Sequence, residues 1–496
     1  MILSKPLNWL MGIFKRENYA YFGGAKGNRL LSNWILSEVS IDRKLYSDLK
    51  GLRARARNLV HESPMMARYV NVMRSNIIGS TGIKLQMKIM DLNKIPDMMA
   101  NDIVERNWEK WGRTCGTKGE SWIQNLLLSV DSYSIDGEIF CRHFIHEGNV
   151  ALECIDANRV DTLLNKAKDS QGPEIRMGIE LDEYGKPTGY WLKQKVTDYR
   201  IPWEQIRGNY IRIPAEEMTH IFFPTEPGQT RGYPPIAPVM NTIHQLNGLN
   251  EATLVSARAV ASQMAFLEKP PGGGKWTGKD DDGNPEIKIE PLALPVLPAG
   301  WKVQAWNPKG PEIYEPFARA MKLEVAVGCG ISYPAISGDL SAVNFSSIRA
   351  GNMQDQEYFK TIQRIIIDRL VYPIFEKWLK VNLINGNLKP LPFTKYNKFN
   401  SPVWSCKRWP YVNPTDEASA RQTELQMGIK SRTQMIEESG GDVEDVFRQL
   451  QQEQQLAQQL QIKIGDGSNG TKTAPSPGDE KSAPGEDGKT GSKSQQ

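Results

Sequence analysis

The sequence predicts an α+β protein made of several lobes, on the basis of its length and of a change in the spacing of its apolar residues. With 496 residues the chain is too long for one compact core, and this length is typical of about two to four domains. Apolar residues recur at helical spacing before residue 80 and again after residue 236. Between about 135 and 223, short β-rich runs alternate with Gly, Asp, Asn and Pro turns, which predicts a β-rich lobe between helical regions.

The N-terminal segment, 1–60, is predicted to form an arm followed by a basic helix. From Met1 to Arg74 the chain holds thirteen Lys and Arg residues against five Asp and Glu. The apolar stripe of the helix consists of Leu45, Leu49 and Leu52. A short basic run in the same helix consists of Arg53, Arg55 and Arg57. Such a run suits contact with phosphates or with an acidic neighbouring subunit, and it equally suits a solvated helix face.

Residues 61–235 are predicted to hold two more helices and the β-rich lobe. The first helix begins at Ser63–Pro64 and ends at Gly79, and the second covers 101–111. A Glu-Tyr-Gly-Lys-Pro sequence at 183–187 predicts a hairpin turn within the lobe. The strands are expected at 139–145, 150–155, 178–181, 190–194, 210–214 and 220–223.

After the β-rich lobe, two helices are predicted on either side of an insertion. Pro234–Pro235 open a long helix over 236–266, and a second helix is expected over 315–327. The insertion between them, 267–314, contains short β-rich stretches, among them Ile287, Ile289, Val296 and Val303. The order is therefore helix, β-containing insertion, helix.

The third long helix of this half is predicted to run from 346 to about 381, after a loop over 330–345. It should kink at Pro373, because the ring removes one donor and clashes with the carbonyl of Arg369. An irregular region, 382–413, follows. The last helices are expected over 416–427, after Ser431 and after Asp442, ending near 460. The segment 464–496 is predicted to be a disordered tail, since from 465 onward it lacks Leu, Ile, Val and aromatic residues.

Composition argues against several classes of protein. The net charge is only +4, so the chain as a whole is not a basic nucleic-acid binder. Its five cysteines are scattered and form no C-x-x-C, which favours free thiols in a reducing compartment over a disulfide framework or a zinc site. No run of eighteen apolar residues is present, so no membrane contact is expected.

The catalytic and metal-binding motifs that the sequence suggests are all incomplete. The Gly-rich run 272–275 is followed by Trp276 rather than Ser or Thr, and the Gly-Lys-Thr at 488–490 lacks its earlier glycine. His143 and His146 stand at i and i+3 of a predicted strand, where side chains point to opposite faces. The acidic run 280–284 has Pro285 where a calcium loop needs glycine. No catalytic residue, cofactor or metal is therefore predicted.

One segment carries a specific pattern. Residues 330–351 contain an aromatic turn, then Gly-Asp, a few small residues, and Asn-Phe-Ser-Ser followed by Arg349. Three other segments accompany it, namely 213–238, the Arg53–Arg57 run before Ser63–Pro64, and 409–415. Together, from about residue 25 to 455, they resemble the lambda-type phage portal proteins. Phe345 stands where that family often has Tyr.

The resemblance implies a phage portal fold with a β-rich wing, a helical stem, a small α/β clip, a tunnel loop with a long kinked helix, and a helical crown. The long helix would return into the wing. On this chain the parts would be the arm and basic helix (1–60), wing (61–235), first stem helix (236–266), clip (267–314), second stem helix (315–329), tunnel loop (330–345), kinked helix and wing return (346–414), crown (415–463) and tail (464–496).

The resemblance also implies a non-enzymatic function. About twelve copies would form a ring at one capsid vertex of the virion, after assembly in the host cytoplasm. Double-stranded DNA would pass through the channel without sequence specificity during packaging and ejection. The partners implied are the terminase large subunit, the major capsid and scaffold proteins, and the head-completion or adaptor proteins.

The loop before the kinked helix is the candidate lining of the channel. It is small and polar, which suits sliding DNA because each additional neutralised phosphate would strengthen an unwanted hold. The same residues also suit a cap of the helix that follows. The candidate lumen residues are Ser337, Asp339, Ser341, Asn344, Ser346, Ser347 and Arg349. The candidate subunit-interface or DNA-proximal residues are Arg53, Arg55 and Arg57.

Two other interpretations compete with a portal. A phage nuclease or packaging ATPase would need clustered carboxylates or a phosphate loop, and carboxylates can converge from distant segments. A head–tail adaptor would be a second structural alternative, but adaptors are usually much shorter chains.

Overall fold

The computed structural model describes residues 38–91, 93, 95–168, 172–194, 208–261, 265–268, 302–305, 314–341, 345–409, 414–438 and 441–460. The chain divides into two compact units, Met1–Ile429 and Lys430–Gln496. The predicted arm, most of the insertion 267–314 and the predicted tail 464–496 lie outside the described residues.

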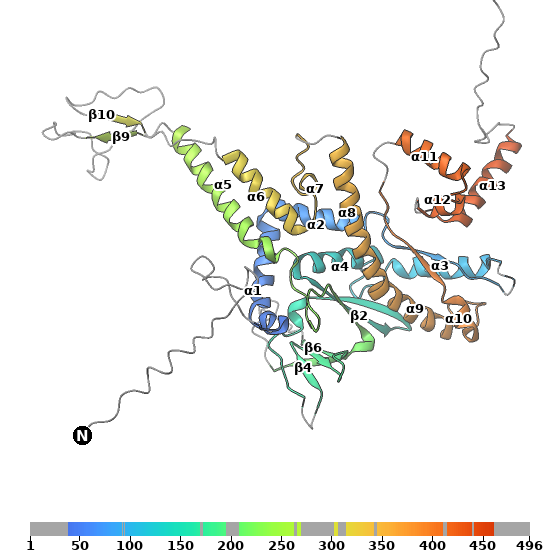
Figure 1. The fold of residues 1–496 in the computed structure, drawn as a ribbon. Helices are drawn as coiled ribbons and strands as arrows, with labels where there is room; N and C mark the ends of the chain where they lie inside the picture. Colours follow the sequence, from blue (N-terminus) through green and yellow to red (C-terminus); the bar gives the residue numbers. More distant parts are fainter. Residues whose placement is uncertain are drawn as a thin grey trace, which may run out of the picture. The chain divides into compact units, whose positions relative to one another are not determined.

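Four helices open the first unit (Figure 1): α1 (Ile41–Glu62), α2 (Pro64–Ile77), α3 (Met98–Gly112) and α4 (Trp122–Asp136). The first three confirm the sequence-based expectations. Ser63 separates α1 from α2, and Pro64 occupies the first helical turn, where a missing N–H costs nothing. Gly79 follows α2 with a φ of +68°, in the left-handed region that glycine adopts without strain.

Helix α4 was not predicted, and the expected start of the β-rich lobe at residue 135 is corrected by it. Its buried face mixes apolar residues with Asn125, Ser129 and Ser134, so the sequence shows no clear apolar stripe. Its beginning is nevertheless marked by a capping box, in which Ser121 and Gln124 satisfy each other's backbone N–H groups. Its end is marked by Gly137, with a φ of +81°.

The β-rich lobe consists of two antiparallel sheets. One has the order β3–β2–β8 and the other β4–β5–β6–β7. The predicted strands and the turn at Gly185 are confirmed, whereas β4 was not predicted. The bounds are β2 (Glu138–His146), β3 (Asn149–Ile155), β4 (Glu174–Arg176), β5 (Ile179–Leu181), β6 (Pro187–Lys193), β7 (Tyr210–Pro214) and β8 (Met218–Phe222).

A two-stranded ladder joins segments that lie far apart in the sequence. β1 (Lys84–Met87) pairs antiparallel with β11 (Pro402–Ser405), with Lys84 opposite Ser405. Neither strand was predicted, because each has only four residues and its partner is more than three hundred positions away. The ladder ties the end of the long helical region back to the N-terminal helices.

Helices α5 (Met240–Ala261) and α6 (Tyr314–Cys329) pack side by side and antiparallel (Figure 1). The Tyr314 hydroxyl donates to Asn250 at 2.6 Å near one end, and Thr242 donates to Glu324 at 3.3 Å near the other. The prediction of two helices around a β-containing insertion is confirmed for its described part, where β9 (Ala265–Glu268) pairs with β10 (Lys302–Ala305). The expected extension of the first helix to 266 is corrected, since 265–268 is a strand held by that ladder.

The long kinked helix is confirmed and has three parts. These are α8 (Phe345–Ile366), a π-helical turn η7 (Ile367–Val371) and α9 (Tyr372–Ile384). The Tyr372 N–H bonds the Ile367 carbonyl, five residues back, instead of the fourth carbonyl back. This wider turn stands directly before Pro373, where an ordinary helix would press the proline ring against the Arg369 carbonyl.

The first unit also contains the short helices α7 (Tyr333–Ser337) and α10 (Tyr396–Phe399) and the longer helix α11 (Pro414–Gln426). The second unit, described on its own, contains α12 (Arg432–Glu438) and α13 (Val443–Gln459). The two predicted helix starts, after Ser431 and after Asp442, are confirmed, and each of these side chains caps the helix that follows it. Ser431 accepts from the Gln434 N–H at 3.1 Å, and Asp442 accepts from the Glu444 N–H at 2.7 Å.

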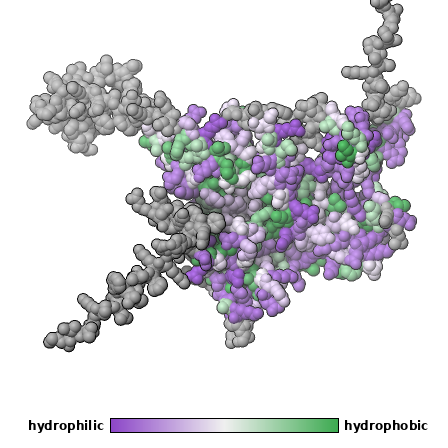
Figure 2. All heavy atoms as spheres, in the orientation of Figure 1, coloured by the Kyte–Doolittle hydropathy of each residue, from purple (hydrophilic) through white to green (hydrophobic). Residues whose placement is uncertain are grey.

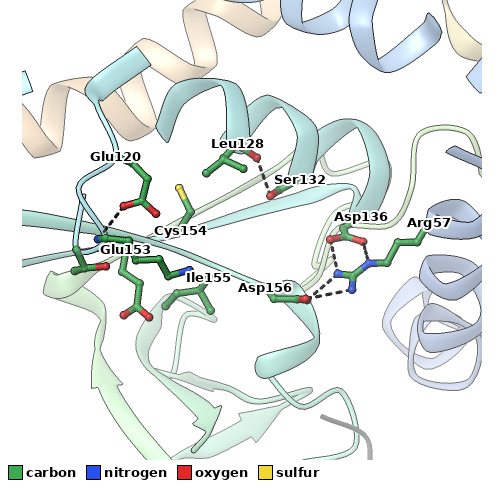
Figure 3. A pocket seen from close by; sticks show the side chains of 11 residues that line it. Arg57, Glu120, Leu128, Ser132, Asp136, Glu153, Cys154, Ile155 and Asp156 are labelled. Atoms are coloured by element: carbon green, nitrogen blue, oxygen red, sulfur yellow. Dashed lines mark hydrogen bonds and ion pairs between the residues drawn. The ribbon is translucent and has the colours of Figure 1, made fainter. Parts of the chain in front are cut away.

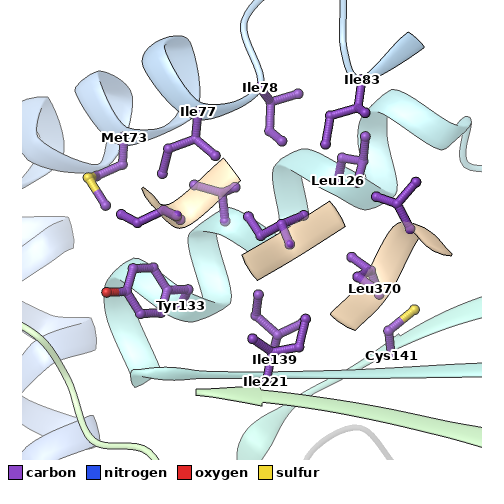
Figure 4. Close-up of a cluster of buried hydrophobic side chains, with 14 of the residues drawn as sticks. Met73, Ile77, Ile78, Ile83, Leu126, Tyr133, Ile139, Cys141, Ile221 and Leu370 are labelled. Carbon is purple, nitrogen blue, oxygen red and sulfur yellow. The ribbon is translucent and has the colours of Figure 1, made fainter. Parts of the chain in front are cut away.

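The core of the first unit lies between its helices and the β3–β2–β8 sheet. Figure 4 shows Met73 and Ile77 of α2, Tyr133 of α4 and Ile139 of β2 pointing into one cluster. A second part of this core is aromatic. Trp108 of α3 lies edge-on to Trp378 of α9, with ring centroids 5.1 Å apart, and it also contacts the rings of Trp111, Trp122, Phe375 and Trp404.

Candidate functional site: the segment between α6 and α8

The segment 330–341 leaves α6 through a defined helix end. Gly330 has a φ of +69°, and its N–H bonds the Val327 carbonyl. The Ile331 N–H bonds the Ala326 carbonyl, which completes a Schellman motif with Ile331 buried against the helix. The direction in which the segment leaves α6 is therefore fixed by backbone geometry.

Two side chains from other helices anchor the next residues. Asp355 of α8 accepts from the Ser332 N–H at 2.9 Å and from its hydroxyl at 2.6 Å. Burial raises the pKa of Asp355, and the two bonds from Ser332 oppose that shift. Arg68 of α2 donates to the Ala335 carbonyl at 3.0 Å, within the short helix α7 (Tyr333–Ser337). The segment is thus held from two sides. The expected loop, 330–345, is corrected, because it contains a helical turn.

The exposed tip of the segment is organised around Asp339. Its carboxylate accepts from the Ser341 hydroxyl at 2.6 Å and N–H at 2.9 Å, and the Ser337 hydroxyl accepts from the Asp339 N–H at 3.1 Å. The bonds from Ser341, helped by the charge of Arg319, hold the pKa of Asp339 below its usual value. A negative charge therefore stays at this tip over the neutral pH range.

The other candidate lumen residues lie on α8. Ser346, Ser347 and Arg349 are exposed in its first turns. Asn344, the remaining candidate, lies outside the described residues. The structure therefore brings Ser337, Asp339 and Ser341 together in one hydrogen-bonded turn, and it places the other three in the helix that follows.

The basic run of α1 is divided by the structure. Arg53 is buried inside the subunit and pairs with Glu138, at the start of β2. The expectation that Arg53 faces a neighbouring subunit or DNA is therefore corrected: residue 53 lies on the inner face of α1, beside Leu49 and Ala56. Arg55 is exposed and stays a proposed contact residue.

Glu138 is the centre of a buried charged cluster that the sequence did not reveal. Arg231 donates to its carboxylate at 2.6 Å, His220 lies 3.1 Å from it, and the Gly232 N–H donates at 3.0 Å. Burial alone would raise the pKa of Glu138, but Arg231 and Arg53 hold it well below its usual value. Burial lowers the pKa of His220 despite the carboxylate beside it. The cluster joins α1, the β3–β2–β8 sheet and the segment leading into α5.

Arg57 borders a surface pocket of about 270 Å³ (Figure 3). Its guanidinium pairs with Asp136 and Asp156, each at 2.7 Å, and its side chain is 30% exposed. Burial opposes the charge, but the hydrogen bonds to both carboxylates hold the pKa of Arg57 above its usual value. Its charge is therefore neutralised within its own chain, and the proposed contact with a neighbour or DNA rests on its exposed edge. Cys154 also lines this pocket.

His143 and His146 lie in different environments on β2. His143 is buried, and its Nδ1 has no hydrogen-bond partner, whereas His146 is exposed. The two rings are thus not placed to share a metal ion. Burial, with the Lys377 ammonium nearby, lowers the pKa of His143 to about 4.

The pH dependence of stability should report this buried imidazole. The folded pKa of His143 lies below the unfolded value of 6.5, so its contribution to stability is lost as pH falls from about 6.5 towards 4. At pH 5 the loss relative to pH 7 amounts to about 2 kcal/mol. Urea unfolding at both pH values should show a smaller pH effect in His143→Leu than in the wild type. The exposed control His146→Leu should keep the wild-type difference, and an unchanged pH effect in His143→Leu would contradict the assignment.

Among the described residues, no group of three or more His, Cys, Asp or Glu side chains is placed to hold a metal ion. The Gly-rich runs at 272–275 and 488–490 and the acidic run 280–285 lie outside the described residues. Within the part of the chain that the structure covers, no helix combines the length and apolar character needed to cross a membrane.

Comparisons with known proteins agree with the pattern found at 330–351. The family described as "Phage portal protein, lambda family" matches residues 27–363. The probable portal protein of Halomonas phage phiHAP-1 is 29% identical over 448 residues, covering 87% of this chain and 86% of that protein. Portal protein B of Escherichia phage lambda is 22% identical over 487 residues, covering 88% of this chain and 89% of that protein.

Among solved structures, the neck of an empty gene transfer agent (GTA) particle with C6 symmetry is similar, with a TM-score of 0.41 and 13% identity over 79% of this chain and 92% of that one. The family match spans well over half of the chain and includes the segment between α6 and α8. The chain belongs to the lambda family of phage portal proteins.

Proposed function

We propose that about twelve copies of this chain form a ring at one capsid vertex, through which double-stranded DNA is packaged and ejected without sequence specificity. The terminase large subunit and, later, the head-completion proteins would dock on this ring, and the major capsid and scaffold proteins would surround it. Assembly would take place in the host cytoplasm. Membership of a family of portal proteins, which are virion components, supports this proposal.

The observation that carries the ring is the outer face of α6. Ala318, Val325 and Ala326 of this helix are buried within the subunit. On its other side Phe317, Leu323 and Val327 are 54%, 51% and 74% exposed. A helix that is apolar on both faces is usually buried on both. We therefore assign the outer face of α6 to contact with a neighbouring copy.

The neighbouring helix α5 extends this apolar surface. Leu254 and Val255, in its second half, are 51% and 56% exposed. Figure 2 shows apolar residues gathered over the α5 and α6 region of the face in view. In a closed ring each subunit presents two different patches to its two neighbours, so this surface would form one side of a repeated head-to-tail contact.

The tip around Asp339 supports a channel that does not hold DNA. Ser337 and Ser341 are small and uncharged, and Asp339 keeps a negative charge that repels phosphates. We assign Ser337, Asp339, Ser341, Ser346, Ser347 and Arg349 to the lumen side of the ring, as the resemblance implies. On the same basis we assign the wing to 61–235, the stem to 236–261 and 315–329, the clip to the insertion between these two stem segments, and the crown to 415–463.

The ring is tested by the native mass of the purified protein. Twelve copies of a 55.9 kDa chain give about 670 kDa, measured by light scattering or native mass spectrometry. The variant Val327→Asp should stay folded, because the side chain is exposed, and should shift the mass towards that of single chains. Ile384→Asp, at an apolar position of α9 that is 62% exposed, should keep the ring.

Three outcomes of this experiment are distinct. A wild-type protein that remains a monomer or dimer at every concentration and salt would overturn the ring. A ring that forms in the wild type and survives Val327→Asp would move the subunit contact away from α6. A ring lost in both variants would show that the effect is not specific to the α6 face.

A further inference from the structure

Strands β2 and β3 place two cysteines directly opposite each other. Cys141 pairs with Cys154 in the antiparallel register of these strands. The Leu152 N–H and carbonyl are both bonded away from β2, to Cys115 and Thr117. Since backbone groups alternate in direction along a strand, residue 154 also points its N–H and carbonyl away from β2. Cys141 and Cys154 therefore form a non-hydrogen-bonded pair, the type in which the two side chains approach most closely.

The distance between the backbones in such a pair lies within the range that a disulfide spans, about 4.4–6.8 Å between Cα atoms. Because Cys141 and Cys154 are directly opposite in the register, their side chains lie on the same face of the sheet, the face that α4 covers. The Cys154 sulfur is also held by α4, where the Asn125 carbonyl lies 3.6 Å and the Asn125 side-chain oxygen 3.5 Å away. Closing an S–S bond here requires little movement of the strands.

Cys154 can be reached from the surface, whereas its partner cannot. Cys141 is buried under α4, but Cys154 lines the pocket bordered by Arg57, Asp136 and Asp156 (Figure 3). A pocket of about 270 Å³ admits small polar molecules, since a water molecule needs only about 30 Å³. The hydrogen bond from Cys141 lowers the pKa of Cys154, although burial opposes this.

The other three cysteines lack this combination of neighbour and access. Burial raises the pKa of Cys115 and of Cys329 to about 12 in each case, and that of Cys406 to about 11. A thiol with so high a pKa is rarely ionised, and the thiolate is the form that attacks an oxidant. Reaction with a small peroxide should therefore begin at Cys154.

We propose that Cys141 and Cys154 are a redox-active pair that forms a cross-strand disulfide on contact with hydrogen peroxide. The Cys154 thiolate attacks one peroxide oxygen, and the O–O bond breaks to release hydroxide, which is protonated to water. The Cys141 sulfur then attacks the Cys154 sulfenic acid while its thiol proton passes to the departing hydroxide, which forms the S–S bond and releases a second water. Both thiol protons end in water, two electrons pass from the sulfurs to the peroxide, and a thiol reductant reverses the process.

A virion component passes from the reducing interior of the host to the oxidising conditions outside it. A disulfide that joins residues 141 and 154 closes a short loop and fastens β3 to the strand that carries Glu138. During assembly in the host the two cysteines would stay reduced. In a particle outside the host the disulfide would form and hold β3 against β2. This role rests on the proposed function, whereas formation of the bond requires only the folded chain.

The experiment uses the full-length protein, reduced, freed of reductant and then treated with hydrogen peroxide. Two of the five thiols should be lost, as measured by alkylation after unfolding, with a mass decrease of about 2 Da. Trypsin cleaves after Arg142, so the disulfide should link peptide 119–142, which contains only Cys141, to peptide 143–159, which contains only Cys154. Reduction should separate the two peptides.

Matched variants identify the order of events. Cys141→Ala should leave Cys154 as a sulfenic acid that dimedone labels, whereas Cys154→Ala should abolish both the label and the crosslink. Cys329→Ala, at a buried cysteine without a facing thiol, should crosslink as the wild type does. The proposal is overturned if wild-type protein keeps all five thiols, if all five oxidise at similar rates, or if Cys154 joins Cys115 instead. A protein that crosslinks but stays monomeric would refute the ring and leave this proposal intact.

Discussion

Replacing Glu138 with Gln is expected to lower the free energy of unfolding by about 3–5 kcal/mol. Glu138 is fully buried and is the carboxylate to which both Arg53 and Arg231 are bonded, each of which is buried as well. The amide keeps the shape of the side chain but removes the negative charge. Two guanidinium groups then remain inside the protein without a counter-charge, and such groups cost far more than exposed ones.

This loss is measured by urea unfolding followed by circular dichroism. Glu217→Gln is the control, because Glu217 also pairs with an arginine, Arg142 at 2.9 Å, but its side chain is 32% exposed. Solvent screens that pair, so the control should lose no more than about 1 kcal/mol. If both variants lost the same free energy of unfolding, the buried charge of Glu138 would contribute no more to stability than the partly exposed charge of Glu217.

Gly137→Ala is expected to lower the free energy of unfolding by more than about 4 kcal/mol. A methyl group at this position would lie 1.8 Å from the Tyr233 carbonyl oxygen, far inside van der Waals contact. Likewise, a methyl group added at Gly232 would lie 2.2 Å from the Gly137 carbonyl oxygen. Two backbone segments therefore cross with no room for a side chain, and neither can move without disturbing the Glu138 cluster between α4 and α5.

Gly185→Ala is the control that distinguishes the cost of the steric clash from the cost of a positive φ. Gly185 has a φ of +80°, nearly that of Gly137 at +81°, but no atom lies within 4 Å of a methyl group placed there. The control should therefore lose only the conformational cost, about 1–2 kcal/mol. Urea unfolding of both purified variants tests the difference. If both variants lost a similar free energy of unfolding, the backbone segments at Gly137 and Tyr233 would be able to move apart at little cost.

The elements predicted best from sequence are those whose signals are local. The caps at Ser431 and Asp442, the break at Ser63–Pro64 and the kink before Pro373 each depend on residues within one helical turn. β1 and β11 escaped prediction because their stability comes from pairing across the chain. Helix α4 escaped because its buried face contains the polar residues Asn125, Ser129 and Ser134, which hide the apolar pattern, although its capping box at Ser121 was readable.

The difference between local and long-range signals also explains which residues of the candidate site could be predicted. The pattern at 330–351 could be found because it is contiguous, and the bonds among Ser337, Asp339 and Ser341 lie within five residues. The role of Arg53 could not be found, since its partner Glu138 lies 85 positions away and only the fold makes that arginine internal. Glu138 itself gave one unused signal, since it is a charged residue followed directly by the three apolar residues 139–141 of the same strand.

The β9–β10 ladder bears on how this family could diversify. Ala305 pairs with Ala265 and Lys302 with Glu268, so the chain leaves and re-enters the α5–α6 pair at one place. Residues inserted or deleted between 269 and 301 would leave the separation of these two ends unchanged. Residues 269–301 can thus be replaced without changing the packing around Glu138 and the Trp108 cluster. Natural variation in length, and grafts from other portal proteins, should therefore concentrate there.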